Sequence, residues 1–456
     1  MEKLCKELTD TYNTNVIDNK GNKLIAQEFM KLATQYRNTG HGKNVLMNLI
    51  YNRYSPDVKK PEPLFIGGPA NLTVHWSNTH KKIIYIFGEA HTDEIDCHIF
   101  QKGKELEDNK EQWDHPNSKL MSAEYFFEQL GITTDSFIDF LIEVPATEMK
   151  SKGYHPDFQP YTGKTRNYRM SKIFDHFKEC INYPTRSAKR CSLFRVHYFD
   201  TRYNDKDTAF KGANIISSFR VDVRSLYETV YAESIPFAYK KLLEDKQEYF
   251  EMFKSLGSSD DNTIFSYLIS QVVKNKYTNK ELGKVENKEV RKFIIEFLQE
   301  ENRKNMNTYK LLWRTHCTIV LQFLKPSGKD SPSPEKFEES FDYIYKSLNN
   351  LNGVVTDVYL LSRLFKVFDL TKMEEKAYTG ATDQPAKATN VVIYTGDTHA
   401  ARYRNFLEKK LDFKQIAETG LNKTNKDGGY PNCIDMKTIP QPFFNFWPLL
   451  DSYKFV

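Results

Sequence analysis

Four short apolar runs, each bounded by polar segments, constrain most what this chain can fold into. Continuous rather than alternating hydrophobicity over so few residues is typical of strands buried on both faces of a parallel sheet. Amphipathic segments lie between the second and third runs: SAEYFFEQLG, with a helix-stopping Gly131, and SKIFDHFKECI. Strand, helix and strand in this order predict an α/β fold with a central, mostly parallel sheet flanked by helices. The runs are IIYIF (83–87), FIDFLIEV (137–144), LFRVHYF (193–199) and VVIY (391–394).

The pattern along the chain predicts a division into domains. NLTVHW and KKIIYIF, separated by SNTH, predict a hairpin that leads into the sheet. After residue 220, about a hundred residues contain helical patterns and no strand-like run, which predicts a helical insertion lobe. PEKFEESFDYIYKSLNNL and VVTDVYLLSRLFKVF then predict two further helices. The predicted parts are an N-terminal helical appendage (1–62), the first half of the α/β core (63–220), the insertion (221–325), a linker (326–334) and the second half of the core with an aromatic C-terminal tail (335–456).

Composition excludes several classes of protein. With 39% hydrophobic and 14% aromatic residues, the chain is globular rather than disordered. A net charge of +5 over 456 residues is too weak for the basic footprint of a nucleic-acid-binding protein. The N-terminus is polar, and no apolar stretch is long enough to cross a membrane, so we expect neither a standard secretory signal nor a membrane span. The six cysteines form no CxxC pair and no regular spacing, which predicts reduced thiols and a cytoplasmic location.

Ionisable residues follow each predicted strand. The first run is followed by Gly88-Glu89-Ala90-His91 and the last by Gly396-Asp397-Thr398-His399. The second run ends in Glu143, and the third leads to Asp200-Thr-Arg202. Carboxyl ends of parallel strands share one edge of a sheet, where ligands bind. A single acid after a strand is more often a helix N-cap, but two Gly-acid-x-His tetrapeptides predict one shared site.

The second tetrapeptide opens a helix. Ala400, Tyr403, Leu407 and Leu411 fall on one face of the segment that follows it. His399 therefore lies in the first helical turn, where the helix dipole disfavours the imidazolium form. A neutral ring can act as a base or bind a metal. Asp397, two residues earlier, can orient that ring or share the metal.

GEAH, IEVP and GDTH, in this order and each at a strand end, resemble the superfamily of erythromycin esterases, ChaN-like proteins and the TraB/Tiki group. HYFDTR (197–202), TDVYLLSRLF (356–365) and IYTGDTHAARY are similar to uncharacterised proteins of large DNA viruses within that group. The resemblance covers blocks between about residues 83 and 404. A viral source would place the protein in the host cytoplasm or in the virion.

The resemblance implies a site at the strand carboxyl ends that contains His91, His399, Glu89 and Glu143. Members of the superfamily divide between esterases with a histidine base and peptidases that depend on a metal. Acids in both tetrapeptides favour a divalent metal such as Mn, Fe or Zn, with His91, His399, Glu143 and Glu89 as ligands. No nucleotide is expected, because Phe158 replaces the first glycine of a phosphate-binding loop before YTGKT.

The expected reaction is hydrolysis of an ester or a peptide bond in a small molecule or peptide. Water would be activated by His91 or by the metal, while Arg202 stabilises the oxyanion. Arg202 is as well explained by an ion pair with Asp200. Arg363, on an otherwise apolar helix, is a further candidate. The alternative function is a non-catalytic virion structural or binding protein that retains the fold, with the aromatic tail docking a protein partner.

Overall fold

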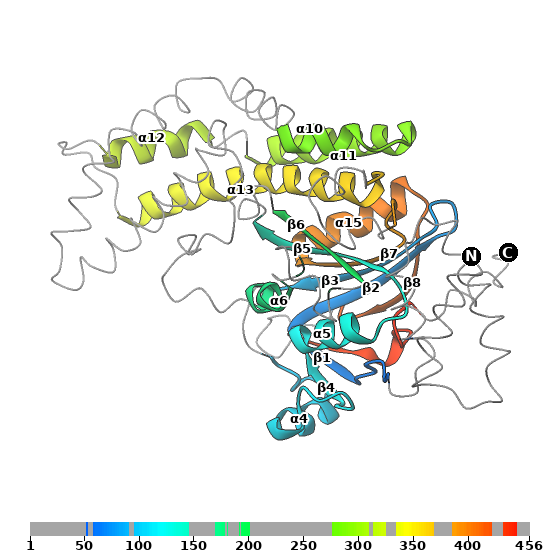
Figure 1. Cartoon of the computed structure of the whole chain (residues 1–456). Coiled ribbons are helices and arrows are strands. Elements are labelled where there is room, and N and C mark those ends of the chain that lie inside the picture. Colours follow the sequence, from blue (N-terminus) through cyan, green and yellow to red (C-terminus); the bar gives the residue numbers. More distant parts are fainter. Residues whose placement is uncertain are drawn as a thin grey trace, which may run out of the picture. The chain divides into compact units, whose positions relative to one another are not determined.

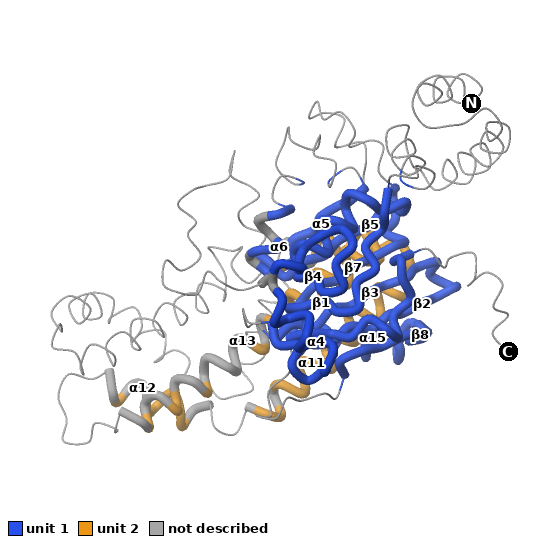
Figure 2. The backbone as a smooth tube through the Cα atoms, turned by 90° about the horizontal axis from the view of Figure 1, so that it is seen from below, with its two compact units in different colours: residues 1–144, 148–199, 367–456 blue, residues 145–147, 200–366 orange. Residues whose placement is uncertain are grey.

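The computed structural model describes residues 52, 58–90, 95–145, 169–177, 180, 191, 193–200, 276–309, 313–324, 334–368, 385–421 and 432–444. The chain forms two compact units (Figure 2). The first comprises residues 1–144, 148–199 and 367–456, and the second comprises 145–147 and 200–366. Among the described residues, no helix is both long and apolar enough to cross a membrane.

A six-stranded sheet is the centre of the first unit, with the order β6-β5-β7-β3-β2-β8. β3 and β5 pair in parallel with β7, whereas β2 pairs antiparallel with β3 and β8. The α/β class is therefore confirmed, as is the hairpin, which is β2–β3. All four predicted runs are strands. The bounds are β2 Pro69–Ser77, β3 Lys82–Glu89, β5 Ile138–Pro145, β6 Phe194–Asp200, β7 Asn390–Gly396 and β8 Lys414–Thr419.

Helices cover both faces of this sheet (Figure 1). α15 (Asp397–Lys410) lies on one face, and α5 (Ala123–Thr133) and α6 (Arg169–Phe177) lie on the other. The Ser122 side chain caps α5 by accepting a hydrogen bond from the Tyr125 amide. The prediction that Gly131 ends α5 is wrong: this buried glycine lies inside the helix, which ends at Thr133. Packing of the helix on the sheet outweighs the low helix propensity of one glycine.

Aromatic side chains fill the core between α5, α6 and the sheet. Phe127 contacts Phe87 on β3 and Phe140 on β5, with ring centroids 5.1 and 4.9 Å apart. Phe443 stacks on Tyr85 at 4.0 Å, so residues of the predicted aromatic tail up to 444 pack back on the sheet. The remainder of the tail, 445–456, and nearly all of the predicted N-terminal appendage lie outside the described residues.

A small second sheet has the order β4-β1-β9 and lies beside helix α4 (Figure 1). A disulfide between Cys97, after β3, and Cys433, on β9, links segments 336 residues apart. A second disulfide joins Cys180 to Cys191. Cys317 is buried outside any disulfide, and Cys5 lies outside the described residues. The bounds are β1 Phe65–Gly67, β4 Leu120–Ser122, β9 Cys433–Asp435, α4 Gln101–Glu107, and the single-turn helices Lys110–Gln112 and Met436–Thr438.

The prediction of reduced thiols is therefore wrong for four of the six cysteines. Spacing along the chain carried no signal for the Cys97–Cys433 pair, because only the fold brings β9 next to the loop after β3. Disulfides persist in oxidising environments and are rare in the cytosol. The expectation of a cytoplasmic location, which rested on reduced thiols, loses that support.

A buried ionic network ties β5 to β6 near the amino end of β5. Arg195 binds Asp139 through two hydrogen bonds of 2.6 and 3.0 Å, and His197 lies 2.8 Å from the same carboxylate. The Arg195 guanidinium also lies over the Phe368 ring, 3.6 Å from its centroid. Burial alone would raise the pKa of Asp139, but Arg195 and His197 hold it well below its usual range. Asp139 is therefore ionised throughout the physiological pH range.

The described part of the second unit is helical. α10, α11 and α12 each pack against α13. α13 is one continuous helix, so the prediction of two separate helices in this region is wrong. Residues 353–362 are buried, and this packing outweighs the cost of about 1 kcal/mol for a glycine within a helix. The bounds are α10 Lys276–Gly283, α11 Lys288–Tyr309, α12 Trp313–Leu324 and α13 Pro334–Phe365.

Candidate functional site

The two Gly-acid-x-His segments begin on neighbouring strands. Glu89, the last residue of β3, is the register partner of Gly396, the last residue of β7. On the other side of β7, Ile142 of β5 pairs with Tyr394. Glu143 is the next residue along β5, so the carboxyl ends of three adjacent parallel strands carry the candidate acids. The predicted convergence at one edge of the sheet is observed for these strand ends.

Glu143 and His399 are in contact. His399 Nε2 lies 3.4 Å from Glu143 Oε1, and the two side chains are only 10% and 4% exposed. The other oxygen of Glu143 accepts hydrogen bonds from the Thr395 hydroxyl at 2.7 Å and the Gly396 amide at 2.8 Å. These bonds fix the carboxylate because β5 and β7 are paired. His399 is positioned independently, in the first turn of α15, which starts where β7 ends.

Glu89 adds a second buried carboxylate at the end of β3. As a whole residue, Glu89 is 1% exposed, compared with 7% for Glu143. Burying a charged carboxylate costs free energy unless it is hydrogen-bonded or paired with an opposite charge. Two buried acids and a buried histidine at the ends of adjacent strands make this edge a candidate site rather than a solvated edge.

Asp397 belongs to a polar cluster next to these strand ends that the sequence did not reveal. Its Oδ1 accepts hydrogen bonds from Asn71 Nδ2 at 2.7 Å and from Arg404 Nη2 at 3.1 Å. Arg404 also donates to Asn71 Oδ1 at 2.8 Å. The position of Arg404, two helical turns after Asp397, could have indicated this pair. Nothing in the sequence pointed to Asn71, because it reaches the site only through the β2–β3 pairing.

Gly88 is required by the close packing at this point. A methyl group on its Cα would lie 2.5 Å from Asn71 Oδ1 and 2.7 Å from Asp397 Oδ1. The glycine of the first tetrapeptide thus allows the Asn71–Asp397 hydrogen bond to lie directly against β3. The glycine of the second tetrapeptide, Gly396, precedes α15 with an ordinary negative φ of −58°.

The place of three predicted site residues relative to these strand ends stays a prediction. His91 and Arg202 lie outside the described residues. Arg363 belongs to the second unit, where its Nη1 donates to the Tyr359 hydroxyl at 3.1 Å and lies 3.5 Å from Glu281 Oε2. Burial opposes ionisation of Glu281, but Arg363 and Lys366 hold its pKa at about 2. Arg363 therefore has a structural ion-pair partner within its own unit.

The strand-end residues fit a metal only in part. The 3.4 Å between His399 Nε2 and Glu143 Oε1 equals the separation of about 3.4 Å expected for two ligands with ~2.1 Å bonds to one tetrahedral metal. Among the described residues, however, the three donors that lie within 4.8 Å of one another are Asp96, His98 and Glu107, and not Glu89, Glu143 and His399. A third ligand at the strand ends would have to come from elsewhere, and the resemblance assigns that place to His91.

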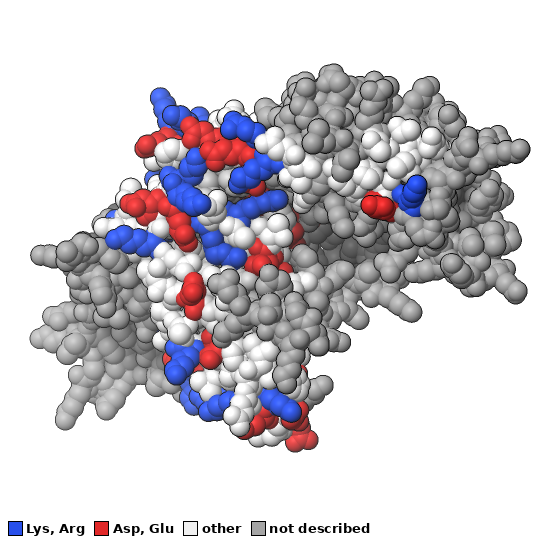
Figure 3. Space-filling view, turned by 180° about the vertical axis from the view of Figure 1, so that it is seen from behind, with Lys and Arg blue, Asp and Glu red and all other residues white. Residues whose placement is uncertain are grey.

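Comparisons with protein-family models, curated proteins and solved structures give no match for this chain. Lysine and arginine side chains of the described residues lie among aspartate and glutamate on the face shown in Figure 3. That mixed arrangement agrees with the small net charge of the chain.

Proposed function

We propose that this protein is a hydrolase that cleaves an ester or a peptide bond at the carboxyl ends of β3, β5 and β7. The observation that carries the proposal is the buried Glu143–His399 pair, 3.4 Å apart and next to a second buried acid, Glu89. A histidine oriented by a fixed carboxylate is the arrangement that general-base catalysis uses to take a proton from water or from a hydroxyl nucleophile.

In this proposal, Glu143 sets the tautomer of His399. The carboxylate favours a proton on the nearer nitrogen, Nε2, which leaves Nδ1 as the basic nitrogen. The bonds from Thr395 and Gly396 hold Glu143 in place, so the ring cannot turn without losing its partner. His399 then accepts the proton of the attacking water at Nδ1 and returns it to the leaving group.

A divalent metal is a second form of the same proposal. His399 and Glu143 would hold it, with His91 and Glu89 as the further ligands that the resemblance implies. Such an ion, when bound, lowers the pKa of a coordinated water and polarises the carbonyl of the substrate. Arg202 is proposed to stabilise the oxyanion. Arg363 remains only a secondary candidate, because it forms an ion pair with Glu281.

The organisation of the chain supports two further proposals. We propose that residues 221–325, which include α10, α11 and α12, form a helical lobe inserted between the two halves of the core. Residues 445–456 are proposed to dock a protein partner. Both proposals continue the sequence pattern, and the helices α10, α11 and α12 support the first.

The test is hydrolysis of a panel of p-nitrophenyl esters and fluorogenic peptides by the purified chain. Glu143→Gln keeps the shape of the side chain but removes its charge, and His399→Ala removes the base. Each should lower kcat/KM by about 10²- to 10⁴-fold. His80→Ala is the matched control, because His80 lies in the hairpin turn before Lys82, at the other end of β3. It should leave kcat/KM unchanged.

Treatment with a chelator distinguishes a metal-dependent hydrolase from one that uses His399 as a base without a metal. Loss of activity with EDTA and its recovery with Zn²⁺ or Mn²⁺ identifies the metal-dependent form, while unchanged activity identifies the histidine-base form. Equal activity of the wild type and His399→Ala contradicts both. A folded wild-type protein that hydrolyses nothing in the panel instead favours the alternative function, a non-catalytic binding or virion structural protein.

A further inference from the structure

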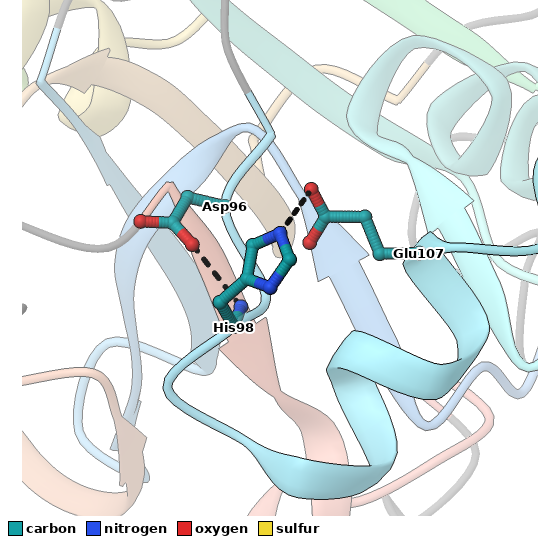
Figure 4. Close-up of side chains that lie close together, drawn as sticks. All are labelled: Asp96, His98 and Glu107. Carbon is teal, nitrogen blue, oxygen red and sulfur yellow. Dashed lines mark hydrogen bonds and ion pairs between the residues drawn. The ribbon is translucent and has the colours of Figure 1, made fainter.

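A second group of potential metal ligands lies in the loop after β3, and the proposed hydrolase does not use it. Asp96 and His98 flank Cys97, and Glu107 is the last residue of α4. Figure 4 shows the His98 imidazole between the two carboxylates. One donor atom from each of the three side chains lies within 4.8 Å of the other two.

His98 and Glu107 form a long ion pair, with a separation close to that of two ligands around a common ion. His98 Nε2 lies 3.6 Å from Glu107 Oε1, which is too long for a hydrogen bond. Two ligands with ~2.1 Å bonds to a tetrahedral metal lie about 3.4 Å apart. Because the His98 side chain is 50% exposed, a small rotation of its ring is enough to reach that spacing.

A disulfide and a hydrogen bond fix the loop that carries these ligands. Cys97 is covalently bound to Cys433 on β9, and its amide donates a 2.6 Å hydrogen bond to Glu107 Oε2. That bond orients the Glu107 carboxylate and leaves Oε1 directed at His98, in the manner of the hydrogen bonds that orient ligands in metal sites. The disulfide packs against the buried side chains of Phe65 and Leu120. The ligands therefore lie on a scaffold that is fixed before any ion binds.

The outer side of the group opens to a depression of about 620 Å³. His98 and Glu107 form part of its wall, together with Asp108, Asn109 and Glu111. Oxygen donors thus line the side from which an ion and its water would enter. Three protein ligands with the remaining position open to solvent is the arrangement found in zinc sites that keep a bound water.

We propose that Asp96, His98 and Glu107 form a binding site for a divalent transition metal, with Zn²⁺ preferred. An imidazole nitrogen combined with two carboxylate oxygens suits Zn²⁺, and the nitrogen disfavours Ca²⁺ and Mg²⁺, which take oxygen ligands. This site is independent of the proposed hydrolase, since none of its ligands belongs to the strand-end residues.

The test is titration of the chelator-treated, full-length chain with Zn²⁺ by isothermal calorimetry, repeated with Ca²⁺. We expect His98→Ala and Glu107→Gln each to weaken Zn²⁺ binding at this site by about 100-fold or more. His176→Ala is the matched control: its Nδ1 lies 3.4 Å from Glu128 Oε2, but no third donor among the described residues completes that pair. It should leave Zn²⁺ affinity unchanged, and circular dichroism confirms that each variant is folded.

The outcome also separates this site from the strand ends. If the strand ends bind a metal as well, the wild type takes up two ions, and His98→Ala and His399→Ala each remove a different one. The proposal fails if wild type and His98→Ala bind Zn²⁺ equally, if the wild type binds none, or if His176→Ala loses as much affinity as His98→Ala. Tighter binding of Ca²⁺ than of Zn²⁺ contradicts the assignment of the metal.

Discussion

Glu89 and Gly396 lie side by side in register on β3 and β7, although about three hundred residues separate them in the chain. This pairing brings the first two residues of each Gly-acid-x-His segment to one edge of the sheet. It also places Gly88 against the Asn71–Asp397 hydrogen bond. Local packing at this edge can therefore be tested by substitutions that leave the acids and the histidine in place.

Gly88→Ala should destabilise the protein. The added methyl group would lie 2.5 Å from Asn71 Oδ1 and 2.7 Å from Asp397 Oδ1, so β3 or these side chains must move. We expect a loss of about 1–3 kcal/mol in the free energy of unfolding, measured with urea. Gly283→Ala is the control, because no atom of the described residues beyond its chain neighbours and its own helix backbone lies within 4 Å of the methyl group there. Equal stability of the two variants would show that the strand ends are loosely packed.

The Asp139–Arg195 pair should be essential for stability. Arg195→Ala leaves the 1%-exposed Asp139 carboxylate without its main partner, which we expect to cost about 3–5 kcal/mol. The control is Lys292→Ala, which removes an exposed pair with Glu296 on α11 and should cost less than about 1 kcal/mol. Denaturant unfolding of both variants measures the difference, and a small loss for Arg195→Ala contradicts the importance of the network.

His75 should make stability depend on pH between about 3 and 6.5. Burial, reinforced by the charge of Arg404, lowers the pKa of His75 to about 3. In this range the unfolded chain binds a proton at His75 and the folded protein does not, so stability falls as the pH falls. The slope is up to about 1.4 kcal/mol per pH unit.

The measurement is urea unfolding of the wild type and of His75→Gln at pH 6.5 and pH 5. Other groups contribute equally to both proteins, so the difference isolates His75. We expect the variant to lose about 2 kcal/mol less than the wild type over this interval. Parallel losses in the two proteins would show that His75 is protonated in the fold.

The Cys97–Cys433 disulfide should stabilise the first unit. Replacing both cysteines by serine removes a crosslink between segments 336 residues apart, and we expect a loss of about 2–5 kcal/mol. Dithiothreitol should lower the melting temperature of the wild type more than that of this double variant. Cys317→Ala, outside any disulfide, should respond to dithiothreitol as the wild type does. Detection of reduced Cys97 and Cys433 by mass spectrometry under non-reducing conditions would contradict the crosslink.

Five of the six strands of the large sheet could be predicted because their signals are local, whereas β8 was not predicted. A buried strand needs a continuous apolar run, and parallel strands carry whatever follows them to a shared edge. The same reasoning led to the candidate residues Glu89, Glu143, Asp397 and His399. Helix ends were predicted less well: Gly131 and the segment around residue 353 lie inside helices because packing outweighs the local preference of glycine.

Sequence alone determined the α/β class, the apolar runs that form buried strands and the acids and histidine that follow them, since each depends on residues near one another in the chain. Only the tertiary structure decided which distant side chains meet: Cys97 with Cys433, Asn71 with Arg404 and Asp139 with Arg195. A disulfide, a buried ion pair or a group of metal ligands needs a separation of a few ångströms in space. The fold sets that separation, because neighbouring strands can come from any part of the chain.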